Sequence, residues 1–231
     1  MPDAQKVNTM FGRIAGRYDL ANRLLSMGID RIWRERLVEE VAYRNPRSVV
    51  DLATGSGDVA FALREGLPSE TSVRGMDFCQ PMLDEAEFKK QKFGYKGVSF
   101  SIGDVLDLPL ADQETDAVTI SFGYRNLAER RKGLLEMKRV LNAKKGHVFI
   151  LEFSQPNALY RPFYYFYLKH FLPTAASFIT GNREAYQYLC SSIEAFPDRE
   201  GITEELEEAG FSGVEAIPMT FGTVALHIGK A

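Results

Sequence analysis

The sequence has few of the residues that build metal sites, disulfides or membrane spans. Its 231 residues include only two cysteines, Cys79 and Cys190, and three histidines. The cysteines lie far apart, with no Cys-x-x-Cys or Cys/His spacing, which argues against a zinc site and fits a reducing compartment. No uncharged stretch is long enough to span a bilayer, and the first residues lack the basic and apolar regions of an export signal. We therefore expect a cytoplasmic protein without a metal.

An excess of positive charge is also missing. The chain has 28 Lys and Arg against 31 Asp and Glu, a formal net charge of −3. Such a chain has no general attraction for phosphate backbones, so nucleic acid is not an expected partner. A hydrophobic content of 45% is enough to bury one full core, and we expect a single domain over residues 1–231.

From Ser48 onward, short apolar runs alternate with helical patterns. The expected strands are residues 48–52, 72–76, 98–101, 117–121, 147–152, 214–217 and 222–228. The expected helices are residues 58–64, 81–92, 129–141 and 201–209. This alternation predicts an α/β fold of the Rossmann-like kind, with a seven-stranded, mostly parallel sheet flanked by helices.

Two segments depart from this alternation. Residues 7–44 show helical periodicity broken near Gly28, which predicts two N-terminal helices that could close over a site as a lid or lie on anionic headgroups. Residues 156–193 read as an aromatic, helical insertion before the last helix-strand-strand unit, with YRPFYYFYLKHF at 160–171. Its aromatic residues could line an apolar binding site or form plain core.

The first expected strand runs into a glycine-bearing turn, DLATGSGD, at residues 51–58. Gly55 and Gly57 would let a ligand approach the backbone closely, and the spacing also satisfies the dinucleotide pattern G-x-G-x-x-A. A pyrophosphate here would be repelled by the carboxylates of Asp51 and Asp58. The ammonium and sulfonium groups of S-adenosylmethionine would be attracted instead, so the charges favour a methyl donor.

Other candidate ligand residues follow the carboxyl ends of later strands. Asp77 stands 20 residues past Gly57, where a cofactor ribose would present its hydroxyls. Asp104 could accept from an adenine amino group while Val105 supports the ring, and Ser121 ends the fourth strand. Taken one at a time, these acids could merely cap a helix or a turn. Their order at successive strand ends predicts one cofactor site.

Four stretches carry a more specific resemblance. They are MFGRIAGRYDLANR at residues 10–23, ISFGYRNL at 120–127, LEFS at 151–154 and VALH at 224–227. With them the chain resembles the quinone-biosynthesis C-methyltransferases, which act on demethylmenaquinone or on a ubiquinone precursor. The resemblance implies a class I S-adenosylmethionine-dependent methyltransferase that methylates a ring carbon of a prenylated quinol, most simply demethylmenaquinol in menaquinone biosynthesis.

The resemblance also implies roles for individual residues. The positions that match the family's contacts to S-adenosylmethionine are Ser56, Asp77, Asp104, Val105 and Ser121. Arg125 and Asn126 fall on its acceptor-side motif. Because a ring carbon is methylated most readily in a phenolate, Arg125 could stabilise that anion, and a water held by Asn126, Arg125 and Tyr18 could carry the proton. The alternatives are a structural ion pair for Arg125 and a packing contact for Tyr18.

Some positions depart from the family pattern. Gly12, Thr54 and residues 142–146 differ from the usual residues, although none is a predicted cofactor contact. Asn182, Gln187 and Ser191 replace residues that are usually Asp, Arg and Glu, which leaves the acceptor open. A ubiquinone-precursor benzoquinol or another small lipid or phenol is the alternative substrate, and a nicotinamide-dependent oxidoreductase is a remote one. The expected partner is a prenylated quinol; the inner face of a membrane and a second copy of the chain remain open.

Overall fold

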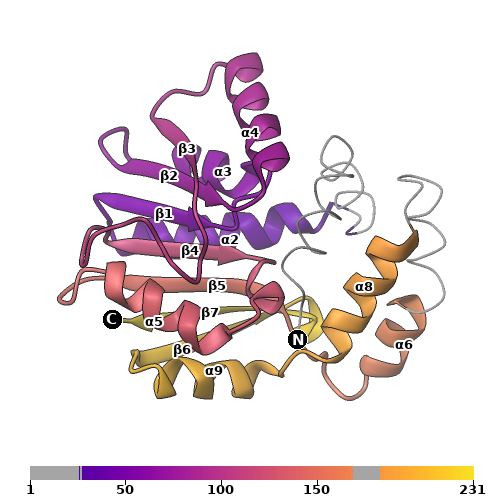
Figure 1. Ribbon diagram of the computed structural model, residues 1–231. Coiled ribbons are helices and arrows are strands. Elements are labelled where there is room, and N and C mark those ends of the chain that lie inside the picture. The colour runs from indigo at the N-terminus through magenta and orange to yellow at the C-terminus, as the bar shows by residue number, and fades with distance from the viewer. Residues whose placement is uncertain (1–25, 27, 169–182) are drawn as a thin grey trace.

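The computed structural model describes residues 26, 28–168 and 183–231, which form a layered α/β structure (Figure 1). Its centre is one sheet in the order β3-β2-β1-β4-β5-β7-β6. The strands are β1 Ser48–Leu52, β2 Ser72–Asp77, β3 Val98–Ile102, β4 Ala117–Ser121, β5 His147–Phe153, β6 Ser212–Met219 and β7 Val224–Lys230. β7 is antiparallel to both of its neighbours, β5 and β6, and all other neighbouring strands in the sheet are parallel. The predicted seven-stranded, mostly parallel sheet is confirmed.

The helices lie around this sheet. They are α2 Asp30–Tyr43, α3 Asp58–Gly66, α4 Gln80–Phe93, α5 Arg130–Val140, α6 Arg161–Phe166, α8 Arg183–Glu194 and α9 Arg199–Glu208, with 3-10 turns η1 Tyr124–Asn126 and η3 Thr220–Gly222. Figure 1 shows α6 and α8 together at one end of the molecule, beyond the sheet. Both belong to the aromatic segment that was expected to be a helical insertion.

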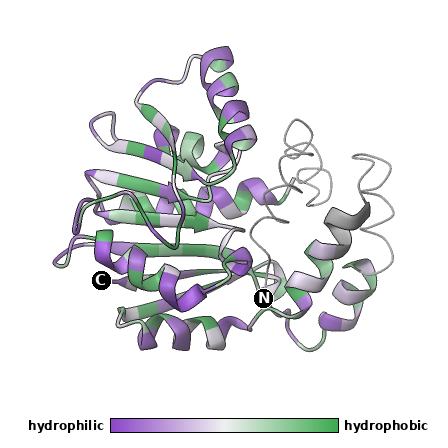
Figure 2. Cartoon of the chain, viewed as in Figure 1, coloured by the Kyte–Doolittle hydropathy of each residue, from purple (hydrophilic) through white to green (hydrophobic). Residues whose placement is uncertain are grey.

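Helices cover both faces of the sheet, and this explains why the sequence of β5 is almost continuously apolar. Phe149 and Leu151 belong to the core cluster that also contains Leu37 of α2 and other residues of α2 and α3. Val148 and Ile150, which alternate with them, belong to the cluster formed with α5 and α9. Successive strand residues point to opposite faces, so a strand buried on both sides needs apolar residues at every position. Figure 2 shows the hydrophobic colour concentrated along the strands.

The element boundaries differ from the expected ones mainly near the C-terminus. The last strand begins at Val224 and not at residue 222, because Thr220–Gly222 forms a 3-10 turn in which Thr220 and Phe221 have φ of 46° and 57°. Helix α2 follows Gly28, whose φ is 78°, in agreement with the expected break there. The first of the two expected N-terminal helices falls on residues outside the described part of the chain. In the described part of the chain, no helix is long and apolar enough to cross a membrane.

Candidate functional site

The turn after β1 requires glycine at both predicted positions. Gly57 has φ of 87°, and a Cβ added there would lie 2.8 Å from the ring of Phe100. Gly55 has φ of 56°, and its Cβ would come within 3.2 Å of Met82. L residues with side chains rarely adopt such backbone angles. At these two positions no side chain covers the backbone of the turn, which lies at the carboxyl edge of the sheet, where open α/β sheets bind ligands. Ser56, between these glycines, is buried.

Asp77 ties the end of β2 to this turn. Its Oδ2 accepts a hydrogen bond from the backbone N–H of Gly55 at 2.8 Å, and its Oδ1 accepts from that of Cys79 at 2.9 Å. Burial raises the pKa of Asp77, while the backbone donors oppose that rise. A carboxylate can accept about four hydrogen bonds, so these contacts leave acceptor capacity for a ligand diol.

Asp51 lies beneath the turn, with only 1% of its surface exposed. Its two carboxylate oxygens accept from the hydroxyls of Thr119 and Thr54, each at 2.6 Å. Burial raises the pKa of Asp51 to about 7, although both hydroxyls oppose the rise and the charge of Asp77 adds to it. Thr54, a departure from the family pattern, therefore holds Asp51 in place. The carboxyl group is close to half charged at neutral pH and can respond to a nearby cation.

The ion pairs of Asp58 change the electrostatic argument that was made from the sequence. Its carboxylate pairs with Arg34 of α2 and Lys89 of α4, both at 2.7 Å. Burial would raise the pKa of Asp58, but these two cations outweigh it and hold the pKa below its usual range. The expectation that Asp58 adds uncompensated negative charge to the turn is wrong. Its charge is neutralised, and the pairs join α2, α3 and α4 instead.

Asp104, Val105 and Ser121 lie at the same edge of the sheet but differ in exposure. Asp104 is exposed, and its Oδ1 accepts from the N–H of Leu106 at 2.9 Å, so it supports a turn and remains open to a ligand. Val105 is 5% exposed, which leaves little of it for an adenine ring. The hydroxyl of Ser121 is buried and has no hydrogen-bond partner in the part of the chain that the structure describes. Such an unsatisfied group is costly, so Ser121 is a plausible ligand contact.

Arg125 is held by a buried ion pair with Glu152. The side chains are 4% and 2% exposed, and Nη1 of Arg125 lies 2.9 Å from Oε1 of Glu152. The other oxygen, Oε2, accepts from the backbone N–H of Arg125 at 3.1 Å. Nη1 also donates to the carbonyl of Phe122, and the guanidinium lies 5.3 Å from the ring centre of Phe153. The structural ion pair considered for Arg125 is therefore present, and it fixes the direction of the guanidinium.

One donor group of Arg125 is left for a ligand. Its Nε faces the hydroxyl of Ser192 on α8 at 3.4 Å. Its Nη2 donates to none of the residues that the structure describes. An ion-paired guanidinium with one terminal nitrogen unused can still bind an oxyanion.

The neighbouring residue, Asn126, faces the aromatic segment. Its Oδ1 accepts from the hydroxyl of Tyr188 on α8 at 3.1 Å, which leaves the amide nitrogen as a donor. Tyr164 of α6 lies within electrostatic range of Arg125; burial raises the pKa of Tyr164, and the arginine partly opposes that rise. In the described part of the chain, the hydrogen bonds that join Arg125 and Asn126 to the aromatic segment are therefore both made to α8. Tyr18, the third predicted catalytic residue, lies outside the described residues.

The sequence interpretation missed Glu152 and Tyr188. For Glu152 a signal was available, because a single carboxylate within the apolar run HVFILEF must be buried and therefore needs a cationic partner. No comparable signal marks Tyr188 among ten tyrosines. Among the described residues, no group of three or more His, Cys, Asp or Glu could hold a metal ion.

Solved structures with the same architecture have low sequence identity. An S-adenosylmethionine-dependent methyltransferase from Aquifex aeolicus aligns with a TM-score of 0.61 and 19% identity, covering 83% of this chain and 88% of its own. The CurJ carbon methyltransferase aligns with a TM-score of 0.68 and 12% identity, covering 94% of this chain and 59% of its own. These similarities show that the fold is the class I methyltransferase fold.

This chain is much more similar in sequence to several curated bacterial proteins. A demethylmenaquinone methyltransferase of Thermus thermophilus is 44% identical over 95% of this chain and 99% of its own length. One from Thermotoga maritima is 41% identical over 95% and 93%. A ubiquinone/menaquinone biosynthesis C-methyltransferase, UbiE, of Citrifermentans bemidjiense is 38% identical over 97% and 96%.

A match to one family covers both parts of the site, from the glycine turn to Arg125 and the aromatic segment. The ubiE/COQ5 methyltransferase family matches residues 2–231, which is almost the entire chain. The chain belongs to the ubiE/COQ5 methyltransferase family.

Proposed function

We propose that this protein transfers a methyl group from S-adenosylmethionine to a ring carbon of a prenylated quinol, with demethylmenaquinol as the substrate in menaquinone biosynthesis. The observation that carries the proposal is the family match over residues 2–231, together with relatives above 40% identity named demethylmenaquinone methyltransferase. A ubiquinone-precursor benzoquinol is the second candidate, because other relatives are named for both pathways.

The residues at the glycine turn fit a cationic donor with a ribose and an adenine. Bound S-adenosylmethionine supplies an electrophilic methyl group. Asp77 has spare acceptor capacity for ribose hydroxyls, and the exposed carboxylate of Asp104 can accept from an adenine amino group. Asp51 gains charge when a cation approaches. The residues proposed to form this site are Asp51, Gly55, Ser56, Gly57, Asp77, Asp104, Val105 and Ser121.

The acceptor side is proposed to stabilise the phenolate. A phenol has a pKa near 10 and is mostly neutral at cytoplasmic pH, whereas its anion makes the neighbouring ring carbon nucleophilic. The unused Nη2 of Arg125 can donate to the ring oxygen, and Glu152 fixes the guanidinium in that direction. A guanidinium stays protonated and so cannot act as the base. The proton of the ring hydroxyl therefore leaves through a water held by Arg125, Asn126 and Tyr18. Tyr188 orients the amide of Asn126 by donating to its Oδ1.

These roles also suggest a function for each larger segment of the chain. We propose one methyltransferase domain over residues 1–231, with residues 7–44 as a lid and residues 156–193 as the acceptor-side insertion. Arg125 and Asn126 support the second assignment, since both contact α8. A prenyl tail partitions into bilayers, so we place the enzyme in the cytoplasm and on the inner face of the membrane during turnover. A homodimer is compatible with this arrangement.

The decisive experiment is quinone profiling by mass spectrometry in cells that lack this protein. Accumulation of a naphthoquinone one methyl group lighter than menaquinone, reversed by restoring the gene, is the expected result. A lighter benzoquinone would favour the second candidate, and an unchanged quinone pool would refute both. Calorimetric titration with S-adenosylmethionine and with NADH separates methyl transfer from the remote oxidoreductase alternative.

A further inference from the structure

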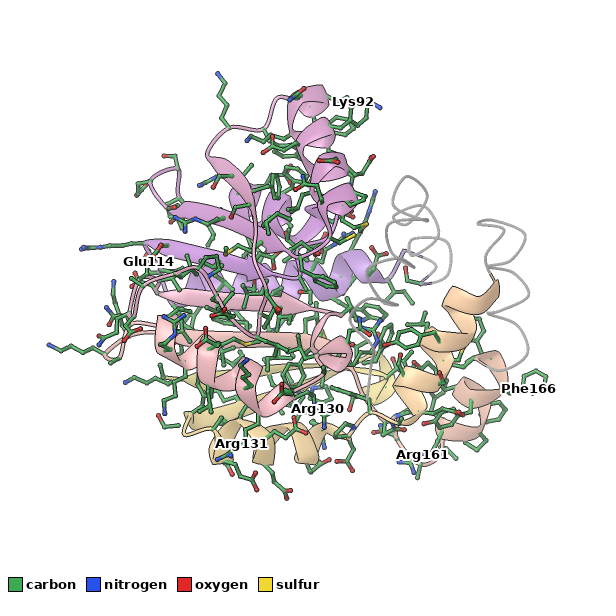
Figure 3. All side chains as sticks on the ribbon, in the orientation of Figure 1. Lys92, Glu114, Arg130, Arg131, Arg161 and Phe166 are labelled. Atoms are coloured by element: carbon green, nitrogen blue, oxygen red, sulfur yellow. The ribbon has the colours of Figure 1, made fainter. Side chains whose placement is uncertain are left out.

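The outer face of the aromatic segment exposes a group of large apolar side chains. Leu159, Phe163, Phe166 and Phe221 are 88%, 71%, 67% and 67% exposed, and we call them the α6 surface. The ring of Tyr160 lies 5.0 Å from that of Phe221, which joins α6 to η3 although about sixty residues separate them in the sequence. Figure 3 shows Phe166 and Arg161 at the outer end of the molecule, away from the sheet. Contiguous exposed apolar groups of this kind mark interaction sites.

The exposure of Phe221 is built into the backbone. Phe221 has φ of 57° and ψ of 24°, in the left-handed region that bulky residues rarely occupy. Two contacts hold the turn: the N–H of Asn157 donates to the carbonyl of Phe221 at 3.0 Å, and Nε1 of Trp33 donates to the hydroxyl of Thr220 at 2.8 Å. A strained turn that is fixed by its surroundings and presents an aromatic ring outward points to a binding role.

The segment between Glu152 and Glu184 has a positive net charge, whereas the whole protein has a negative one. No Asp or Glu occurs between Glu152 and Glu184, while Arg161, Lys169 and Arg183 do. The complete chain carries a net charge of −3. Arg161 is exposed beside the α6 surface. Exposed apolar side chains beside the cation of Arg161, on a segment whose sequence has no acid, match a bilayer that contains anionic lipids, because the rings enter the acyl boundary while the cation meets the headgroups.

The end of α6 is linked to the acceptor residues through α8. The carbonyl of Leu168, just after α6, accepts from Sγ of Cys190 on α8 at 2.9 Å. The hydroxyl of Ser192 on α8 lies 3.4 Å from Nε of Arg125, whereas Phe163 and Phe166 on α6 are exposed. We infer that the α6 surface docks the protein on an anionic lipid bilayer and so presents Arg125 to a quinol ring whose prenyl tail stays in the membrane. This inference rests on the proposed function for the identity of the acceptor.

Vesicle flotation with the full chain tests the inference. The test variant carries Phe163→Ser, Phe166→Ser and Phe221→Ser. The control carries Tyr43→Ser, Phe88→Ser and Phe93→Ser, which remove aromatic rings that are 85%, 54% and 64% exposed elsewhere on the molecule. Each protein is mixed with vesicles of phosphatidylcholine alone or with phosphatidylglycerol added. Folding is checked by S-adenosylmethionine binding, and activity by methylation of a soluble, short-tailed quinol.

We expect the parent and the control to float with the anionic vesicles, and the test variant to bind them at least about tenfold more weakly while still methylating the soluble quinol. Failure of the parent to float, or equal flotation of the test variant, would overturn the inference. So would a parent dimer that dissociates in the test variant without any vesicle binding, because the α6 surface would then join two copies. If the parent and the control float, the test variant binds more weakly as expected, and none of the three proteins methylates a quinol, docking stands and the proposed function fails.

Discussion

Removing the charge of Glu152 should destabilise the protein strongly, although Glu152 contacts neither proposed ligand. The substitution Glu152→Gln keeps the shape of the side chain. It removes the ion pair with Arg125 and places an amide N–H₂ or a single carbonyl where two backbone N–H groups, those of Arg125 and Phe153, now donate. With both charged side chains at most 4% exposed, loss of one partner leaves a buried charge without compensation.

The expected cost is about 3–5 kcal/mol, the range typical of breaking a buried ion pair. That is a large part of the roughly 5–15 kcal/mol by which domains are stable. In urea unfolding the midpoint should fall by about 1–2.5 M, given a slope of about 2–3 kcal/mol/M. Arg74→Met is the matched control, because its pair with Glu114 is a single contact at 3.1 Å, is 38% and 35% exposed, and should contribute less than about 1 kcal/mol. Glu114 is labelled in Figure 3.

The double variant Arg125→Met, Glu152→Gln should be more stable than the sum of the two single changes predicts, because neither charge is then left alone. Arg125→Ala should share the destabilisation, because it leaves the buried carboxylate of Glu152 without its cationic partner. Activity of these variants must therefore be measured well below their unfolding temperature. There, Arg125→Ala should bind the donor normally and turn over about 100-fold more slowly, with partial recovery at higher pH, whereas Arg125→Lys should restore only part of the lost rate. A loss of stability below about 1 kcal/mol in Glu152→Gln would refute the buried pair, and parental turnover in Arg125→Ala would refute the acceptor role.

The donor side yields four further predictions. Donor affinity should rise severalfold from pH 5.5 to 7.5, because a bound cation favours the charged form of Asp51 and that form becomes more populated as the pH passes a pKa of about 7. Calorimetry should show the rise in the parent but not in Asp51→Asn, and a flat parent profile would contradict the coupling. Asp77→Ala should weaken donor binding by about 1–3 kcal/mol; unchanged affinity in the folded variant would remove Asp77 from the site. Asp104→Asn should keep part of the affinity, since one acceptor oxygen survives, while Asp104→Leu should lose it; equal values would exclude the adenine contact. Gly57→Ala should cost about 2 kcal/mol or more in thermal unfolding, because its φ is 87° and the new Cβ would meet Phe100 at 2.8 Å, and an unchanged midpoint would show that the turn can adapt.

The agreement between sequence and structure is best where local pattern carries the information. All seven strands were expected, because a buried parallel strand needs an apolar residue at each position and this pattern lies within a few consecutive residues. The boundary at Val224 was displaced, since the turn at Thr220–Gly222 is held by Trp33 and Asn157, which lie far away in the sequence. No local pattern could have shown that contact.

By itself the sequence determined the fold, the place of the glycine turn and the family, because each depends on residue types at short, regular spacing. Only the tertiary structure decided which charges are available. Asp58 looked like a free acid and is neutralised by Arg34 and Lys89, while Arg125 is paired with a carboxylate 27 residues away. The charge that a side chain offers to a ligand depends on burial and on partners from other elements, and those are set only when the helices pack onto the sheet.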